Sequence, residues 1–97
     1  MTTDTDRVAT RIVVHGRVQG VWYRGWTVDQ ARARGLTGWV RNRREGTVEA
    51  LFHGPAEAVR HMVEACREGP VTAHVRRVRE YADEPPDEPG FLQRPTV

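Results

Sequence analysis

The sequence predicts an α+β fold in which two helices cover one face of a β-sheet. Strand-like segments, whose apolar residues alternate, and helix-like segments, whose apolar residues recur every three to four positions, follow one another in the order β-α-β-β-α-β. The connections between these segments are short. The chain has 97 residues, 38% of them hydrophobic and 29% charged, which is enough for one two-layer core but not for two. We therefore expect residues 7–97 to form a single domain after a disordered leader at residues 1–6.

The first part of the chain is expected to form a strand, a helix and a second strand. In residues 8–14, the apolar residues at positions 8, 12 and 14 share one parity, with a polar arginine at position 11, as in a half-buried strand. A helix is predicted over residues 22–34. Gly35, which follows it, can adopt the left-handed conformation that ends many helices. Residues 36–42 are predicted to form the second strand. The apolar stripe of the helix is expected to comprise Thr27, Val28 and Ala31.

A hairpin and a second helix are predicted next. Residues 47–53 form the third predicted strand, and residues 43–46 form the hairpin loop, with Gly46 at a positive φ. The second helix should begin at Gly54 and Pro55, because proline suits a first helical turn, and it should end before residue 69. One face of the third strand is expected to carry Val48, Ala50 and Phe52, and the core face of the helix Val59, Met62, Val63 and Cys66.

The last part of the sequence predicts two edge strands. In the fourth strand, residues 73–81, Val75 and Val78 lie three positions apart, which indicates a bulge or an irregular edge. After an acidic, proline-rich loop, residues 91–96 are expected to form a short strand, which Pro95 confines to an edge. This order of elements predicts the ferredoxin-like βαββαβ sandwich, an antiparallel sheet with two helices on one face.

The composition excludes several classes of enzyme and of location. The chain has no serine and no lysine, so all 15 of its Lys and Arg residues are arginines, and serine nucleophiles, Schiff-base lysines and Walker-type phosphate loops are ruled out. The lone Cys66 rules out an intramolecular disulfide, and the four histidines lack metal-ligand spacing. No apolar run is long enough to span a bilayer or to act as a signal peptide. We expect a cytoplasmic protein with no membrane partner.

The run from Gly16 to Arg24 lies at the predicted junction of the first strand and the first helix. The first N–H groups of a helix lack internal partners, and the helix dipole leaves them partly positive. Glycines at positions 16 and 20 let the backbone close around an anion, and an arginine can hold it through two parallel hydrogen bonds. Arg17 either adds positive potential at the mouth of such an anion site or is a solvated loop charge. The segment therefore predicts a site for a small oxyanion, above all a phosphate.

Two segments of the chain resemble the signature motifs of the acylphosphatase family. The run Val14–Arg24, VHGRVQGVWYR, looks like the first signature. Residues 38–42, GWVRN, followed by residues 46–49, GTVE, and Gly54, look like the second, and their separation also matches. The resemblance covers roughly residues 8–82. It implies a ferredoxin-like fold and a small, metal-free hydrolase that cleaves acyl phosphates to a carboxylate and inorganic phosphate.

The resemblance also implies roles for individual residues. The family's phosphate-binding arginine falls on Arg24, and its water-positioning asparagine falls on Asn42. Acyl phosphate would be the substrate and inorganic phosphate the product, with no cofactor, no metal and no nucleic-acid partner, and a monomer is expected. The backbone cradle for the phosphate oxygens would comprise Gly16, Arg17, Val18, Gln19, Gly20, Val21, Trp22 and Tyr23, together with Arg24.

The sequence departs from the family pattern in places, and other functions stay open. Tyr23 stands where phenylalanine or methionine is usual, so its hydroxyl needs a partner, while Glu45 is a variation in the turn and residues 92–95 are a weaker version of the last strand. Taken alone, Arg24 could be a solvated helix arginine and Asn42 a residue that ends a strand. The alternative function is a non-catalytic ferredoxin-like module that binds nucleic acid or senses an anion.

Overall fold

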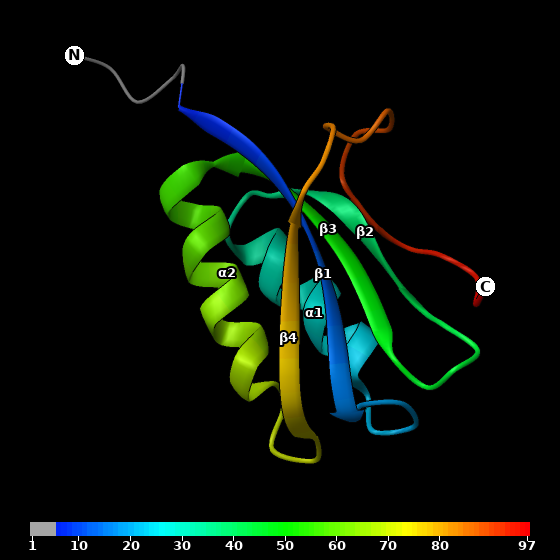
Figure 1. Cartoon of the computed structure of the whole chain (residues 1–97). Helices are drawn as coiled ribbons and strands as arrows, with labels where there is room; N and C mark the ends of the chain where they lie inside the picture. Colours follow the sequence, from blue (N-terminus) through cyan, green and yellow to red (C-terminus); the bar gives the residue numbers. More distant parts are fainter. Residues whose placement is uncertain (1–5) are drawn as a thin grey trace.

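The computed structural model describes residues 6–97 and contains one five-stranded sheet with two helices on the same face (Figure 1). The sheet order is β4-β1-β3-β2-β5. The predicted leader lies outside the described residues except for Asp6, whose carbonyl accepts a hydrogen bond from the N–H of Ala56. The elements are β1 (Arg7–Arg17), α1 (Tyr23–Ala33), β2 (Thr37–Asn42), β3 (Val48–Pro55), α2 (Ala56–Glu68), β4 (His74–Ala82) and β5 (Phe91–Gln93).

The predicted ferredoxin-like sandwich is confirmed, with one change in the direction of a strand. β1 pairs antiparallel with β3 and β4, and β2 pairs antiparallel with β3, but β5 runs parallel to β2. The sheet is therefore mixed and not wholly antiparallel. The reason is topological: β4 runs opposite to β2, and the loop after β4 reverses the chain once more before it reaches the far edge.

The last strand is also shorter than predicted. It ends at Gln93 instead of residue 96, because Pro95 has no N–H with which to continue the ladder. The chain still follows β2 beyond that point, since Arg94 N–H donates to the carbonyl of Val40 and Val97 N–H donates to that of Asn42. The last residues of the chain thus lie beside Asn42, the residue that is expected to position the water.

Both helices pack on the sheet through the faces predicted for them, except that in α1 a different residue takes the place of one predicted core residue. α2 buries all four predicted residues, whereas α1 buries Tyr23, Thr27 and Ala31, and Val28 is only half-buried. α1 ends as predicted: Gly35, with a φ of 69°, donates to Arg32, and Leu36 donates to the carbonyl of Ala31. α1 covers β2 and β5, while α2 covers β1, β3 and β4. Within residues 6–97, neither helix is long and apolar enough to cross a membrane.

β1 continues three residues beyond its predicted end, because of a close approach between two backbones. Gly16 and Arg17 pair with Val75 and His74 of β4, and the register shifts next to His15, which is the irregularity expected of the fourth strand. Gly16 has a φ of 133°, and a Cβ there would overlap the carbonyl oxygen of His74. Glycine is thus required here for packing against β4.

Replacing Gly16 by alanine is therefore expected to lower the free energy of unfolding by roughly 2–4 kcal/mol, from overpacking and from backbone strain. Urea unfolding would measure the loss. Gly35→Ala is the matched control, because Gly35 also has a positive φ but no atom lies within 4 Å of its missing Cβ. It should cost about 1 kcal/mol, from the backbone alone. Equal losses in the two variants would contradict the packing role of Gly16.

Candidate active site

A cavity of about 260 Å³ lies where the loop after β1, the first turn of α1 and the ends of β2 and β5 meet. Residues 18–22 form the loop, and β2 contributes its last residue. The elements come from three separate parts of the chain, so only the folded sheet brings them together. The lining residues are Val18, Gly20, Trp22, Arg24, Gly25, Asn42 and Gln93.

The backbone beside this cavity presents a run of N–H groups without acceptors. The first intrahelical bond of α1 runs from Trp26 N–H to the carbonyl of Trp22, and no side chain caps the helix. Within residues 6–97, none of the N–H groups of residues 18–25 donates to a protein acceptor. Gly20, with a φ of 74°, and Trp22, with a φ of 68°, both turn the loop through left-handed conformations. Such a loop before a helix N-terminus favours an anion.

Arg24 is the second residue of α1, so its side chain leaves the first helical turn beside these N–H groups. Within the described residues, its guanidinium makes no hydrogen bond and no ion pair. Several other arginines within residues 6–97 also lack a hydrogen-bond or ion-pair partner, but all of them are exposed, whereas Arg24 is half-buried. A half-buried charge without a counter-charge is costly, and a bound anion would offset that cost.

Asn42 ends β2 and lies opposite Val48 in the ladder with β3. Its Oδ1 atom is the one buried side-chain oxygen or nitrogen among residues 6–97 that lacks a hydrogen-bond partner. An unpaired buried acceptor of this kind costs about 1–3 kcal/mol. Because Asn42 lines the cavity, a bound molecule with a hydrogen-bond donor would satisfy it there.

Gln19 joins the loop to the β2–β3 hairpin. Its Nε2 atom donates to the carbonyl of Arg43 at 2.7 Å and to that of Thr47 at 2.9 Å. Arg43 follows Asn42 directly, and its N–H donates back across the hairpin to the same Thr47 carbonyl. One amide side chain thus fixes the position of Asn42 relative to the free N–H groups of the loop.

Comparison with known proteins points to one family. The acylphosphatase family model matches residues 10–92. The chain belongs to the acylphosphatase family. An acylphosphatase of Azorhizobium caulinodans is 60% identical over 87 residues, covering 89% of this chain and 94% of the relative. An acylphosphatase of Rhodospirillum rubrum is 58% identical over 84 residues, covering 87% of this chain and 92% of the relative.

A solved structure of the same family extends the likeness to the fold. The acylphosphatase of Coxiella burnetii matches with a TM-score of 0.89 at 32% identity, covering 97% of this chain and all of that one. The family predicted from the two motifs is confirmed, and so is the predicted class of enzyme, an acylphosphatase.

The acylphosphatase fold brings some of the predicted cradle residues to the cavity and directs others away. Gly16 and Arg17 lie in β1 beside β4 and do not line it. Val18 lines it but also belongs to the hydrophobic core. The carbonyl of Val21 accepts a hydrogen bond from the Thr72 hydroxyl, which holds the loop.

Tyr23 does not line the cavity, and its side chain is buried in the hydrophobic core. Its hydroxyl donates to the carbonyl of Cys66 at 2.7 Å, which supplies the partner that the sequence required. Burial raises the pKa of the Tyr23 hydroxyl and raises the pKa of the Cys66 thiol to about 12. Both groups therefore stay protonated at neutral pH, and neither is a nucleophile.

Sequence reasoning missed two of the residues that line the cavity. Gly25 follows Arg24 in the first turn of α1, and its place near the start of the predicted helix is the one feature of the sequence that could have indicated it. Gln93 comes from β5, which joins β2 at the far edge of the sheet. No local pattern indicates that contact, because it depends on the pairing of two strands far apart in the chain.

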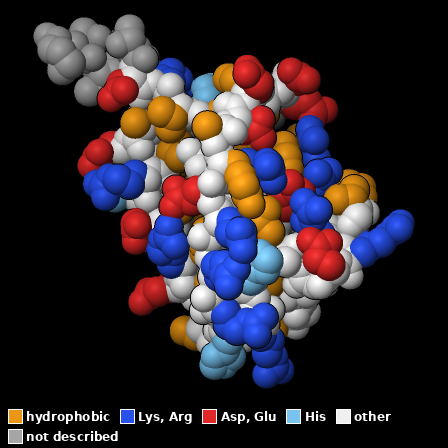
Figure 2. Space-filling model, viewed as in Figure 1, with side chains coloured by type: hydrophobic (Ala, Val, Ile, Leu, Met, Phe, Trp, Pro, Cys, Tyr) orange, Lys and Arg blue, Asp and Glu red, His pale blue; other side chains and the backbone are white. Residues whose placement is uncertain are grey.

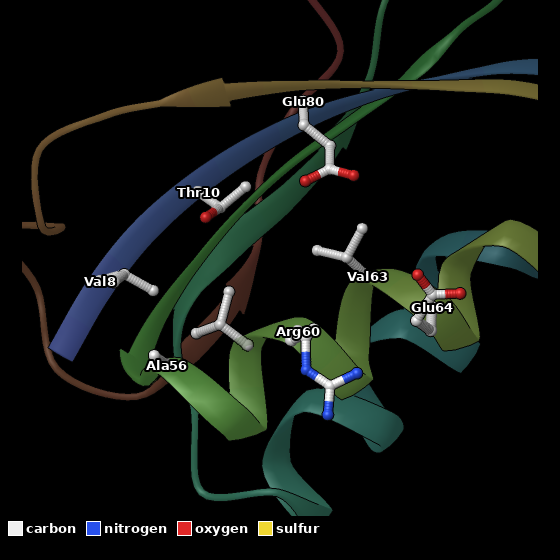
Figure 3. Close-up of a pocket in the computed structure, with 8 residues that line it drawn as sticks. Val8, Thr10, Ala56, Arg60, Val63, Glu64 and Glu80 are labelled. Carbon is white, nitrogen blue, oxygen red and sulfur yellow. The ribbon is translucent and has the colours of Figure 1, made fainter. Parts of the chain in front are cut away.

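Two other hollows of the molecule suit an acyl phosphate less well. The first, of about 150 Å³, lies between α2, β1 and β4, where Glu80 extends toward Val63 (Figure 3). Its lining includes the carboxylates of Glu64 and Glu80 and the guanidinium of Arg60, so negative charge exceeds positive charge there and an anion is disfavoured. The second is lined by His15, Arg76 and Arg77, and Figure 2 shows basic side chains gathered over β4. It is basic, but no helix begins there to supply free N–H groups.

Proposed function

We propose that the protein hydrolyses acyl phosphates, with the phosphoryl group held by the free N–H groups of residues 18–25 and by Arg24. The observation that supports this most is the meeting, at one cavity, of three kinds of unsatisfied group. These are a run of N–H donors, a half-buried guanidinium without a counter-charge and a buried amide oxygen without a donor. An acyl phosphate with an attacking water would satisfy all three.

In the proposed reaction, the Oδ1 atom of Asn42 accepts a hydrogen bond from a water and aims its oxygen at phosphorus, in line with the anhydride bond. The bond from the water oxygen to phosphorus forms as the bond from phosphorus to the acyl oxygen breaks. The carboxylate leaves with the electron pair of that bond. The proton of the water passes to a phosphate oxygen of the substrate, so that no protein base is needed.

The roles proposed for these groups follow from the chemistry of the leaving group. A carboxylate is stable as an anion, so it needs no general acid. What remains is to position the reactants and to stabilise the charge on the equatorial oxygens of the phosphoryl group. Fixed N–H dipoles and a guanidinium supply that stabilisation, and one donor aimed at developing charge contributes roughly 3–4 kcal/mol.

The alternative of an RNA-binding module receives less support from the open face of the sheet. Ferredoxin-like RNA-binding modules stack bases on exposed aromatic rings of this face. Within residues 6–97, the aromatic side chains here are Trp39 and Tyr81, and arginines cover both. Arg11 lies 4.5 Å from the ring of Tyr81, and Arg41 lies 4.6 Å from the ring of Trp39. One face of each ring is thus stacked against a guanidinium, and Trp39 is nearly buried, which leaves Tyr81, 40% exposed, as the one partly open aromatic side chain on this face within residues 6–97. The predicted monomeric state and cytoplasmic location stay predictions.

The proposal is tested by the release of phosphate from benzoyl phosphate. We expect turnover that follows Michaelis–Menten kinetics, competitive inhibition by inorganic phosphate and no change on addition of a chelator. Competitive inhibition tests the cradle itself, because product phosphate would occupy the same N–H groups. Absence of turnover together with tight binding of phosphate would indicate an anion-sensing domain. Binding of single-stranded RNA at moderate salt, without turnover, would indicate the nucleic-acid module.

A further inference from the structure

Trp22 is an exposed aromatic residue at the edge of the proposed phosphate site. Its side chain is 62% exposed, the most exposed aromatic among the large hydrophobic residues of the described chain. It is also the one residue other than glycine with a positive φ within residues 6–97, with φ 68° and ψ 21°. A bulky side chain rarely adopts this conformation, because its Cβ crowds the following carbonyl. Exposure and strain together call for an explanation other than packing.

The local geometry holds the indole beside the cavity. A Cβ at Gly25 would overlap the Nε1 atom of Trp22, so the ring lies against the backbone of Gly25 in the first turn of α1. Trp22 and Gly25 line the same cavity as Arg24 and Asn42. Within the described residues, the indole N–H donates no hydrogen bond. The ring is therefore placed by the backbone and presents an unoccupied apolar face next to the proposed phosphate site.

We infer that Trp22 forms the subsite for the acyl group and that it favours substrates with a planar aromatic acyl group. This inference rests on the proposed function. With the phosphoryl group held by Arg24 and the loop, the acyl group is one anhydride oxygen away and must lie at the cavity mouth. Apart from Val18, which is buried in the core, the other lining residues are small or polar, as are Gly20 and Gln93. The indole supplies the large apolar surface, and two aromatic rings attract each other through offset or edge-to-face contact.

The alternative is that Trp22 only shapes the loop, and suitable variants separate the two roles. Trp22→Gly removes the ring and keeps a residue that adopts a positive φ without strain, so the loop can retain its path. Trp22→Phe retains an aromatic face. The two variants are compared with wild type by kcat/KM for benzoyl phosphate and for acetyl phosphate, whose acyl group offers no ring.

We expect Trp22→Gly to lower kcat/KM about tenfold more for benzoyl phosphate than for acetyl phosphate, since the loss of an aromatic contact and of the apolar area that it buries is of this size. Trp22→Phe should restore most of the preference. Inhibition by inorganic phosphate, which does not reach the ring, reports any change that a substitution makes in the N–H groups of the loop, and such a change should affect both substrates alike. An equal loss for both substrates would overturn the inference in favour of the loop-shaping role.

Binding of the non-hydrolysable analogues benzoylphosphonate and acetylphosphonate, measured by calorimetry, decides the inference without turnover. The wild type should prefer benzoylphosphonate, and Trp22→Gly should lose that preference; equal affinities in the wild type would contradict the inference. If the wild type binds both analogues with the expected preference but hydrolyses neither acyl phosphate, the proposed function fails while the subsite stands.

Discussion

Replacing Arg24 by alanine should lower kcat/KM for benzoyl phosphate by at least about 10³-fold and should abolish competitive inhibition by inorganic phosphate. The guanidinium is half-buried beside the free N–H groups of α1 and has no protein partner within residues 6–97. Its removal deletes both a charge and a fork of donors that fits two phosphate oxygens. Steady-state kinetics with phosphate as inhibitor would measure both losses. Arg24→Lys should recover little, because an ammonium cannot form the bidentate contact.

Arg17→Ala is the matched control for this prediction. It removes the same charge from a residue seven positions earlier, but Arg17 is exposed in β1 and does not line the cavity. We expect kcat/KM to change less than about threefold, through the long-range field alone. Near-normal activity of Arg24→Ala would refute the proposed mechanism. A large loss in Arg17→Ala would show that the anion is bound nearer to β4 than the cavity suggests.

Asn42→Ala should lower kcat by about 10²–10³-fold while the inhibition constant of phosphate changes little. In the proposed mechanism the amide orients the water and does not hold the phosphoryl group, so its loss affects turnover more than binding. Among residues 6–97 the Oδ1 atom has no hydrogen-bond partner, so truncation removes an unsatisfied buried acceptor. The free energy of unfolding should therefore fall by less than about 1 kcal/mol, or even rise. Steady-state kinetics and urea unfolding of the same variant would measure the two effects.

A combination of lost turnover and retained stability would identify Asn42 as a residue of the site. Asn42→Asp is a useful companion, because a carboxylate of the same shape can still accept a hydrogen bond from water but repels the phosphoryl group. It should therefore weaken inhibition by phosphate, which the alanine variant should not do. A loss of several kcal/mol of stability in Asn42→Ala would instead support the reading of Asn42 as a residue that ends a strand and shapes the turn.

Much of the architecture could be predicted from local sequence patterns. The order of the elements, the core face of α2 and the cap at Gly35 depend on residues within a few positions of one another. Errors fell where a boundary depends on a distant partner. β1 runs on to Arg17 because β4 lies against Gly16, and β5 stops early and runs parallel to β2.

The chemical groups of the site could also be predicted from the sequence, but their arrangement in space could not. Arg24 and Asn42 stand in motifs, and the glycine loop before a predicted helix indicates an anion site by itself. Which amides of that loop are free is a tertiary fact, since β4 engages Gly16 while residues 18–25 keep their N–H groups unpaired. The double hydrogen bond from Gln19 to the hairpin, the partner of the Tyr23 hydroxyl and the place of Gln93 at the cavity are likewise invisible in the sequence.

The order of residues along the chain was enough to predict the fold class, the core faces, the family and the two side chains that we propose act on phosphate and water. Periodicity, capping and motif spacing are local properties, and they are written in consecutive residues. The meeting of three features at one cavity is a property of the folded chain: within residues 6–97, an amide oxygen without a partner at the end of β2, a helix N-terminus without a side-chain cap, and an exposed indole. Those groups are separated by up to about twenty residues, and the packing of α1 on the sheet, not any local preference, brings them together.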